Sequence, residues 1–214
     1  PSAQCGRGCI VTTPLTRPRP HRIGWGIRAA MTRVLLVLGF VFGLSPALAG
    51  DQGPAPRDMV VLTVSGLIGK TNRGPLDPKR DSTLALQKID FKNAFAFDRP
   101  MLLALPQGTV TLQPPEFDHP ATFSGPLLRE VLGYLEAAQV RTNFVAMNGY
   151  TGWLDPDDIK SSDWILALAA DGVPLGLGQQ GPIWLLNTRA PDFKPDDEHH
   201  GHWVWAVFYM RIGD

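Results

Sequence analysis

The chain has 214 residues, of which 44% are hydrophobic, and carries 20 basic and 20 acidic side chains. Six of the 20 basic residues are arginines within residues 1–49 and all 20 acidic residues follow, which leaves residues 50–214 with 14 basic and 20 acidic side chains. An acidic body without a basic cluster repels phosphate backbones, so nucleic acid is excluded as an expected partner. Both cysteines, Cys5 and Cys9, also precede residue 50, so the body has no thiol for a disulfide or a metal ion.

Residues 31–49 have the three-part pattern of a secretory signal peptide. Arg33 gives a positive start, residues 34–42 form an apolar run, and small residues at Ala47 and Ala49 suit the signal peptidase. The apolar run is shorter than the roughly 20 residues that span a bilayer. We therefore expect cleavage after Ala49, a periplasmic location and no membrane span in the processed chain. Residues 1–30 show no periodicity and are interpreted as a non-native upstream or disordered segment.

A single domain is expected over residues 59–214, preceded by a mobile lead-in, residues 50–58, that is rich in Pro and Gly. Residues 59–65 are β-branched and apolar, which predicts a strand. Residues 84–91 alternate weakly and are expected to form a second strand. Asp98 is a good N-cap for a short helix that has Pro100 in its first turn.

The strongest helix pattern follows Ser124. Ser124 is a suitable N-cap, and Pro126 is tolerated in the first turn of a helix. The apolar residues that follow fall on one helical face, at the i, i+3, i+4 and i+7 positions: Leu128, Val131, Leu132 and Leu135. The sequence therefore predicts a helix that packs on a sheet.

Strands dominate the rest of the chain. They are predicted over residues 109–112, 143–147, 164–170, 183–186 and 203–210, with a hairpin at Asp171-Gly172. Residues 203–210 are apolar at odd and even positions alike, so we expect both faces of this strand to be covered. Its tryptophans, like Trp184, are expected to be core residues. Many strands and few short helices predict an α+β fold with a mixed sheet or distorted barrel.

The sequence Glu198-His199-His200-Gly201-His202 is the one metal-like cluster in the sequence. In an extended chain His200 and His202 point to the same face and His199 points away, so only two imidazoles converge. No third ligand has a defined place in the sequence, and a solvated polar loop is the favoured interpretation. The sequence motifs of zinc proteases, serine hydrolases and nucleotide-binding loops do not occur.

Planar side chains occur near glycine-rich turns at Phe117, Tyr150 and Trp153. Together with the polar side chains of Glu116 and Asn148, they are suited to sandwich a flat heterocycle and to hydrogen-bond its edge. The alternative is that these rings are ordinary core residues.

Eight short stretches resemble, in order, the oxidoreductase molybdopterin-binding domain family, which has the sulfite-oxidase-like fold. They read LTVSG (62–66), ALPQ (104–107), TFSGPLLR (122–129), AMNGY (146–150), ILAL (165–168), DGVPL (171–175), GPIW (181–184) and WVW (203–205). The resemblance covers residues 59–213 and implies that fold, in its small exported form.

Catalytic members of that family hold molybdenum through a cysteine thiolate, which residues 50–214 lack. We therefore expect neither molybdenum nor sulfite-oxidase turnover. The cysteine-less branch resembles periplasmic pterin-binding regulators. That resemblance implies a reduced pterin or molybdopterin-like heterocycle as ligand, and the periplasmic domain of a membrane diguanylate cyclase or phosphodiesterase, a sensor in cyclic-di-GMP signalling, as partner. A molybdopterin-dependent oxidoreductase and a ligand-free periplasmic adaptor remain as alternatives.

The sequence departs from the family pattern at three places. Asn148-Gly149-Tyr150 replaces Asn-Asp-Tyr, Gln180 replaces a common Lys, and Phe117 stands where a Trp is frequent. The resemblance implies that Phe117 stacks on the ligand, that Glu116 and Asn148 bond its edge, and that Tyr150 lines the pocket beside Gly181. The expected ligand-binding residues are thus Glu116, Phe117, Asn148, Tyr150, Trp153 and Gly181.

Overall fold

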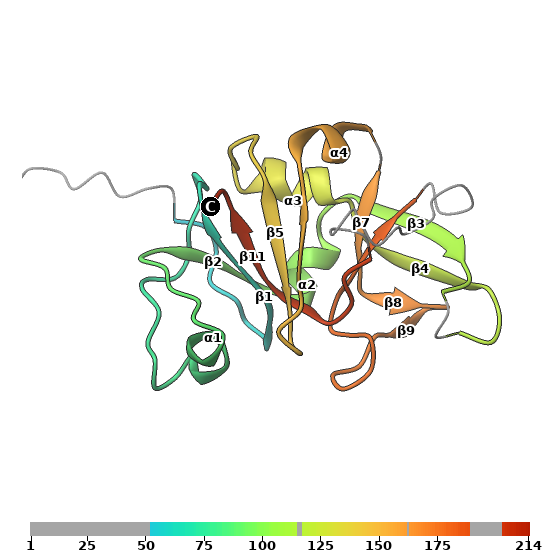
Figure 1. Ribbon diagram of the computed structural model, residues 1–214, viewed down its shortest axis with the longest axis horizontal. Coiled ribbons are helices and arrows are strands. Elements are labelled where there is room, and N and C mark those ends of the chain that lie inside the picture. The colour runs from blue at the N-terminus through green and yellow to red at the C-terminus, as the bar shows by residue number, and fades with distance from the viewer. Residues whose placement is uncertain (1–51, 115–116, 162, 189–202) are drawn as a thin grey trace, which may run out of the picture. The chain divides into compact units, whose positions relative to one another are not determined.

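The computed structural model describes residues 52–114, 117–161, 163–188 and 203–214 (Figure 1). The expected signal peptide, Glu116 and the histidine cluster with His200 and His202 lie outside these ranges. Within them the fold is α+β, as the sequence predicts, with three sheets and four short helices. The described strands do not close into a barrel. No helix in the described ranges is long and apolar enough to cross a membrane.

The largest sheet has five strands in the order β2-β1-β11-β5-β6. Strands β1 and β11 are parallel, and the other neighbouring pairs are antiparallel. The strands are β1 (Val60–Gly66), β2 (Ala94–Asp98), β5 (Thr142–Ala146), β6 (Thr151–Leu154) and β11 (Val207–Ile212). Strands β5 and β6 form a hairpin. One cavity adjoins the turn of this hairpin, and another adjoins its opposite end.

The second half of the fold contains the two smaller sheets. One has the order β3-β4-β8-β9, and the other pairs β7 with β10. Their strands are β3 (Gln107–Leu112), β4 (Ala121–Pro126), β7 (Trp164–Ala167), β8 (Ala169–Ala170), β9 (Val173–Pro174) and β10 (Trp184–Asn187). Strands β4 and β7 approach so closely that a Cβ atom at Gly125 would collide with the backbone carbonyl of Leu166.

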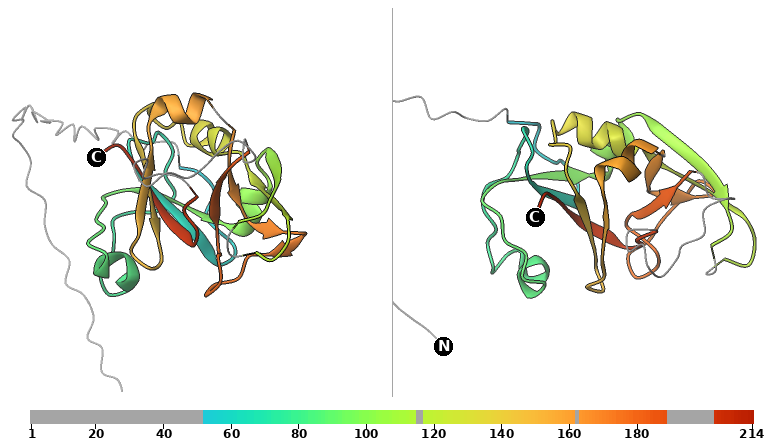
Figure 2. Two further views of the ribbon diagram at one scale, coloured as in Figure 1. Left: turned by 45° about the vertical axis from the view of Figure 1, so that its right-hand side comes forward. Right: turned by 45° about the horizontal axis from the view of Figure 1, so that its top comes forward.

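The four helices are short: α1 (Ser82–Leu86), α2 (Arg99–Leu103), α3 (Leu128–Tyr134) and α4 (Pro156–Ser161). Helices α3 and α4 lie together at one end of the five-stranded sheet and α1 lies at the other end (Figures 1 and 2). Helix α2 begins as the sequence predicts, since the Asp98 side chain accepts a hydrogen bond from the N–H of Met101 at 2.8 Å.

Two hydrophobic clusters hold the sheets together. The larger joins the five-stranded sheet to α3 and to residues of β7 and β10, with Leu62, Phe144 and Leu185 fully buried. The smaller lies between the other two sheets and contains Phe123 and Trp184. Trp203 packs against both clusters. The expectation that Trp184 is a core residue is confirmed, because only 1% of its surface is exposed.

The structure corrects two of the predicted elements. Residues 84–91 are not a strand, because α1 occupies the start of this segment and a turn follows, in which Lys88 has a φ of 59°. Ser124 is not a helix N-cap either, since Ser124 lies in β4 opposite Thr109 and helix α3 begins only at Leu128. The apolar face of α3 is as predicted, with Leu128, Val131 and Leu135 fully buried.

The segment that precedes β11 also differs from the prediction. The strand was expected to begin at Trp203, but Trp203 and Ala206 have φ values of 51° and 54°, which no strand accommodates, and β11 begins at Val207. These two bends turn Trp205 outward, so that 39% of it is exposed and the expectation of a core residue is wrong for Trp205.

The described part of the lead-in, residues 52–58, is hydrogen-bonded to the body of the domain. The backbone N–H groups of Arg57 and Asp58 donate to the Asp98 carboxylate at 2.7 and 3.1 Å, and Asn72 donates to the carbonyl of Pro54 at 2.8 Å. These contacts fix the start of β1 against β2.

Candidate ligand-binding site

Three chain segments meet at the end of β5: the turn at residues 146–150, the glycine-rich loop at residues 176–182, and the bent segment at residues 203–206. Backbone hydrogen bonds join them. The N–H of Met147 donates to the carbonyl of Ala206 at 2.9 Å, and the N–H of Ala206 donates to the carbonyl of Gln180 at 2.8 Å. The segments are far apart in sequence, so the site exists only once β5 and β11 have paired.

A cavity of about 220 Å³ opens at this junction. Its walls are Ala146, Asn148, Tyr150, Trp203, Val204 and Trp205. None of these side chains is charged, and three of the six are aromatic. Pockets for drug-sized ligands have volumes of roughly 300–1,000 Å³, so this cavity is suited to a ligand of one or two rings. An uncharged, partly aromatic lining favours a flat polar heterocycle over an anion such as a phosphate.

The turn that carries Asn148 is closed by its own side chain. The carboxamide oxygen of Asn148 accepts a hydrogen bond from the N–H of Tyr150 at 3.0 Å, and the N–H of Ala146 donates to the carbonyl of Tyr150 at 2.8 Å. Gly149 has a φ of 89°, a backbone conformation that residues with a side chain adopt only with strain. The carboxamide nitrogen of Asn148 remains available as a donor at the cavity.

Trp203 supplies a second unused donor. Its indole N–H is buried and has no hydrogen-bond partner among the described residues. Leaving a buried donor unpaired costs about 1–3 kcal/mol, and an indole nitrogen can only donate. A ligand with a carbonyl oxygen or a ring nitrogen as acceptor would satisfy this group. Tyr150 and Trp205, which are 46% and 39% exposed, add aromatic surface at the same cavity.

Phe117 lies in an aromatic cluster instead of lining this cavity. Its ring centroid is 5.4 Å from that of Phe123 and 6.1 Å from that of Trp184. Trp203 packs against the same cluster and also lines the cavity, so it is the described ring that connects the two places. Glu116, the neighbour of Phe117, lies outside the described residues.

Trp153 is at the other end of the β5–β6 hairpin. It pairs with Asn143 in β5, whereas the cavity adjoins Ala146. The guanidinium of Arg141 lies over the Trp153 ring at 5.3 Å and also forms two hydrogen bonds with Asp155. The hydrogen bond from Arg141 lowers the pKa of Asp155 against a smaller opposing effect of burial. The structure therefore brings Asn148 and Tyr150 together without Trp153.

Gly181 is buried beside the cavity without lining it. Its N–H donates to the carbonyl of Gly176 at 3.2 Å, and it forms a bridge with Leu177. Its neighbour Gln180 accepts from Ala206, so the loop supports the segment that carries Trp203 and Trp205. The sequence does not predict the lining residues Trp203, Val204 and Trp205 as site residues. The backbone bends at Trp203 and Ala206 place them at the cavity, and an apolar run of residues does not indicate such bends.

The residues present do not fit a molybdenum centre of the thiolate type, since residues 50–214 contain no cysteine. In the described ranges no group of three or more His, Cys, Asp or Glu residues is placed to hold a metal ion. His200 and His202 lie outside those ranges.

No family model matches the chain, and no curated protein matches it. Among solved structures, the sulfane dehydrogenase SoxCD from Paracoccus pantotrophus is similar to it, with 17% sequence identity and a TM-score of 0.46. The match covers 72% of this chain and 38% of the SoxCD chain, so the chain spans well under half of that protein.

Proposed function

We propose that the protein binds a small flat heterocycle of the reduced-pterin class in the cavity formed by residues 146–150 and 203–205. One observation carries this proposal: two residues that line an uncharged, partly aromatic cavity, Trp203 and Asn148, each have a side-chain donor without a partner among the described residues. A pterin ring presents a carbonyl oxygen and ring nitrogens as acceptors along its edges. Burying its faces against aromatic rings adds apolar and stacking contacts.

The size of the cavity favours the free pterin over a larger derivative. A volume of about 220 Å³ accommodates a two-ring heterocycle, whereas molybdopterin also carries a third ring and a phosphate. None of the described residues that line the cavity has a cationic side chain to receive a phosphate. The proposed ligand is therefore a pterin without a phosphate tail.

The proposed role is binding without turnover. Residues 50–214 provide no thiolate for molybdenum, and the described residues that line the cavity include no carboxylate, imidazole or thiol to act as acid, base or nucleophile. We further propose that the protein is exported to the periplasm by cleavage after Ala49. There the loaded form would contact the periplasmic domain of a membrane diguanylate cyclase or phosphodiesterase. The signal-peptide pattern and the family resemblance support this second step.

Isothermal titration calorimetry of the full chain with tetrahydrobiopterin, under anaerobic conditions, tests the binding step. The expected result is a dissociation constant in the micromolar range, weaker binding of fully oxidised biopterin, and no binding of a nucleotide phosphate of similar ring size. No measurable heat at 1 mM tetrahydropterin, which corresponds to less than about 4 kcal/mol of binding free energy, would overturn the proposal. Molybdenum at about one atom per chain in the purified protein would favour an oxidoreductase instead.

A further inference from the structure

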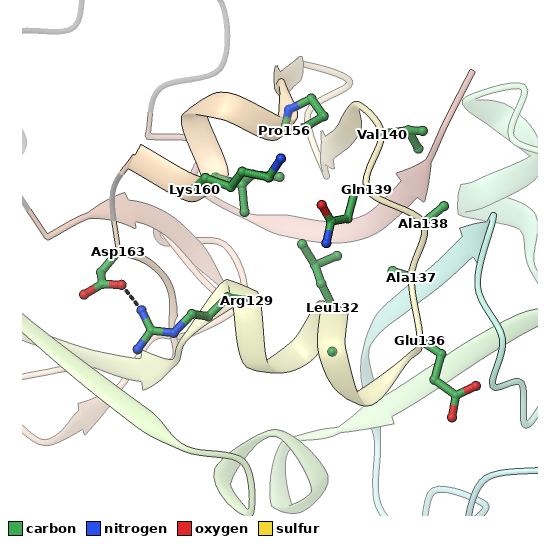
Figure 3. A pocket seen from close by; sticks show the side chains of 12 residues that line it. Arg129, Leu132, Glu136, Ala137, Ala138, Gln139, Val140, Pro156, Lys160 and Asp163 are labelled. Carbon is green, nitrogen blue, oxygen red and sulfur yellow. Dashed lines mark ion pairs between the residues drawn. The ribbon is translucent and has the colours of Figure 1, made fainter.

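A larger cavity, of about 320 Å³, lies at the opposite end of the β5–β6 hairpin. It lies between helix α3, the connection at residues 137–140 and helix α4, so it adjoins the start of β5 and the residues that follow β6 (Figure 3). The pterin-class site adjoins the end of β5 and the turn before β6. The two cavities share no lining residue, so an inference about the second does not rest on the proposed function of the first.

The floor of this cavity is apolar. Leu132, Ala137, Val140 and Ile159 line it, and each is only partly buried although it packs against the main core. Helix α4 is held in place over this floor, because the indole N–H of Trp164 donates to the carbonyl of Asp158 at 3.1 Å. The walls are therefore fixed to the core, and the apolar surface between them is open to a ligand.

Among the described residues, the charged side chains around the cavity leave one cation, that of Lys160, without an ion-pair partner. Arg129 forms an ion pair with Asp163, which Figure 3 shows at one end of the cavity. Glu136 at the other end points away from the centre and pairs with Lys70 at 3.4 Å. Lys160 forms no ion pair with any described residue, and its amine extends over the cavity toward Gln139 (Figure 3).

We infer that this cavity is a second binding site, for a small amphipathic organic anion. The ligand has an apolar body the size of a medium-chain fatty acid and one carboxylate or sulfonate group. The apolar body covers Leu132 and Ile159, and the anionic group pairs with Lys160. A neutral apolar compound would contact Leu132 and Ile159 but would form no ion pair with Lys160. A volume of about 320 Å³ is at the lower end of the range for small-molecule pockets, which excludes two-chain lipids.

Gly133 gives a way to block this site without disturbing the fold. It lines the cavity from the exposed side of α3, and a Cβ atom added there would meet no other atom within 4 Å. Gly133→Leu therefore places a side chain into the cavity at a position where leucine favours the helix. Gly74 is a matched control, because a Cβ atom there also meets nothing within 4 Å and Gly74 lines neither cavity.

The test uses the full chain with 1-anilinonaphthalene-8-sulfonate as a fluorescent probe, and decanoate or decanol as competitors. The expected results are displacement of the probe by decanoate, a loss of affinity for decanoate of roughly ten-fold or more in Gly133→Leu, and no change in Gly74→Leu. Lys160→Gln is expected to weaken the binding of decanoate by about three- to five-fold and to leave the binding of decanol unchanged. Lys92→Gln is the control, because Lys92 is exposed and has no ion pair in the described ranges, and it is expected to change the affinity for neither compound.

Thermal unfolding of each variant establishes that it is folded. Equal decanoate affinity in the wild type and in folded Gly133→Leu would overturn the assignment of this cavity. Equal effects of Lys160→Gln on decanoate and decanol would overturn the assignment of an anion. Unchanged tetrahydropterin binding in Gly133→Leu is expected in either case, so failure here is distinguishable from failure of the pterin-class site.

Discussion

The carboxamide oxygen of Asn148 accepts a hydrogen bond from the backbone N–H of Tyr150 at 3.0 Å. The bond ties the two residues into one turn and uses the acceptor half of the Asn148 side chain. The donor half is left for the cavity. The same bond fixes the backbone of Tyr150, whose carbonyl accepts from Ala146 at the end of β5. The turn is thus ordered before any ligand binds.

Asn148→Ala is expected to weaken tetrahydropterin binding by about five-fold, because one donor to the ligand, worth about 1 kcal/mol, is lost. Calorimetric titration of the full chain measures the change. Asn143→Ala is the matched control: the Asn143 side chain donates to the carbonyl of Gly213 at 3.1 Å, away from the cavity. That variant is expected to lose stability and retain ligand affinity. The assignment of Asn148 as a ligand donor is wrong if both variants bind like the wild type.

Trp203→Phe is expected to separate ligand affinity from stability. The substitution keeps an aromatic ring against both core clusters and removes a buried N–H that has no partner among the described residues. Without ligand, the melting temperature should stay the same or rise, since an unpaired buried donor costs about 1–3 kcal/mol. Tetrahydropterin affinity should fall by about ten-fold. A lower melting temperature together with unchanged affinity would show that the N–H serves the fold and not the ligand.

Gly125→Ala is expected to destabilise the domain by about 3 kcal/mol, because the added methyl group collides with the backbone of Leu166 where β4 crosses β7. Chemical denaturation measures the loss. Gly133→Ala is the control, since a methyl group there meets no atom within 4 Å and alanine favours the helix by about 0.5–1 kcal/mol. A Gly125→Ala variant as stable as the Gly133→Ala variant would contradict the close packing of the two strands.

Asp98 makes the stability dependent on pH. Burial alone would raise the pKa of the Asp98 carboxyl, but hydrogen bonds from the N–H groups of Met101, Arg57 and Asp58 outweigh burial and hold this pKa below its ordinary value of 3.8. The ionised Asp98 carboxylate therefore contributes fully to the stability of the fold above pH 3.8, and this contribution is lost as the pH falls through the lowered pKa.

Asp98→Asn is the corresponding test, with chemical denaturation followed between pH 7 and pH 2. The variant is expected to be about 2 kcal/mol less stable than the wild type near neutral pH, because an amide is a weaker acceptor for three N–H groups than a carboxylate. The difference should shrink as the pH falls below about 4. A difference that stays constant down to pH 2 would contradict the role of the ionised carboxylate.

The fold class and several elements follow from local sequence. Asp98 caps its helix as predicted, and the dipeptide Asp171-Gly172 forms the expected hairpin, because both features depend on neighbouring residues alone. The local sequence at Ser124 is compatible with two structures, since a good capping residue followed by a Pro also fits the end of a strand. Ser124 is a strand residue and not a helix cap because it pairs with Thr109 and Ala169, which are distant in sequence.

The candidate site was predictable only in part. Asn148 and Tyr150 flank a glycine turn, which favours them as ligand-binding residues, and the structure places both at the cavity. The sequence predicts a strand at Trp203 and Trp205, since an unbroken apolar run gives no sign of positive φ values at Trp203 and Ala206. Trp153 is close to Tyr150 in sequence, but the extended β6 strand carries it to the other end of the hairpin.

Binding of a flat heterocycle at Trp203 can be followed through the indole N–H signals in a two-dimensional nitrogen–proton NMR spectrum of the full chain during a tetrahydropterin titration. Each of the six tryptophans gives one such signal. We expect the Trp203 signal to move to lower field and its movement to saturate, while the Trp153 and Trp164 signals stay in place. A Trp203 signal that does not move at 1 mM ligand, or a shift confined to Trp153, would rule out binding at Trp203.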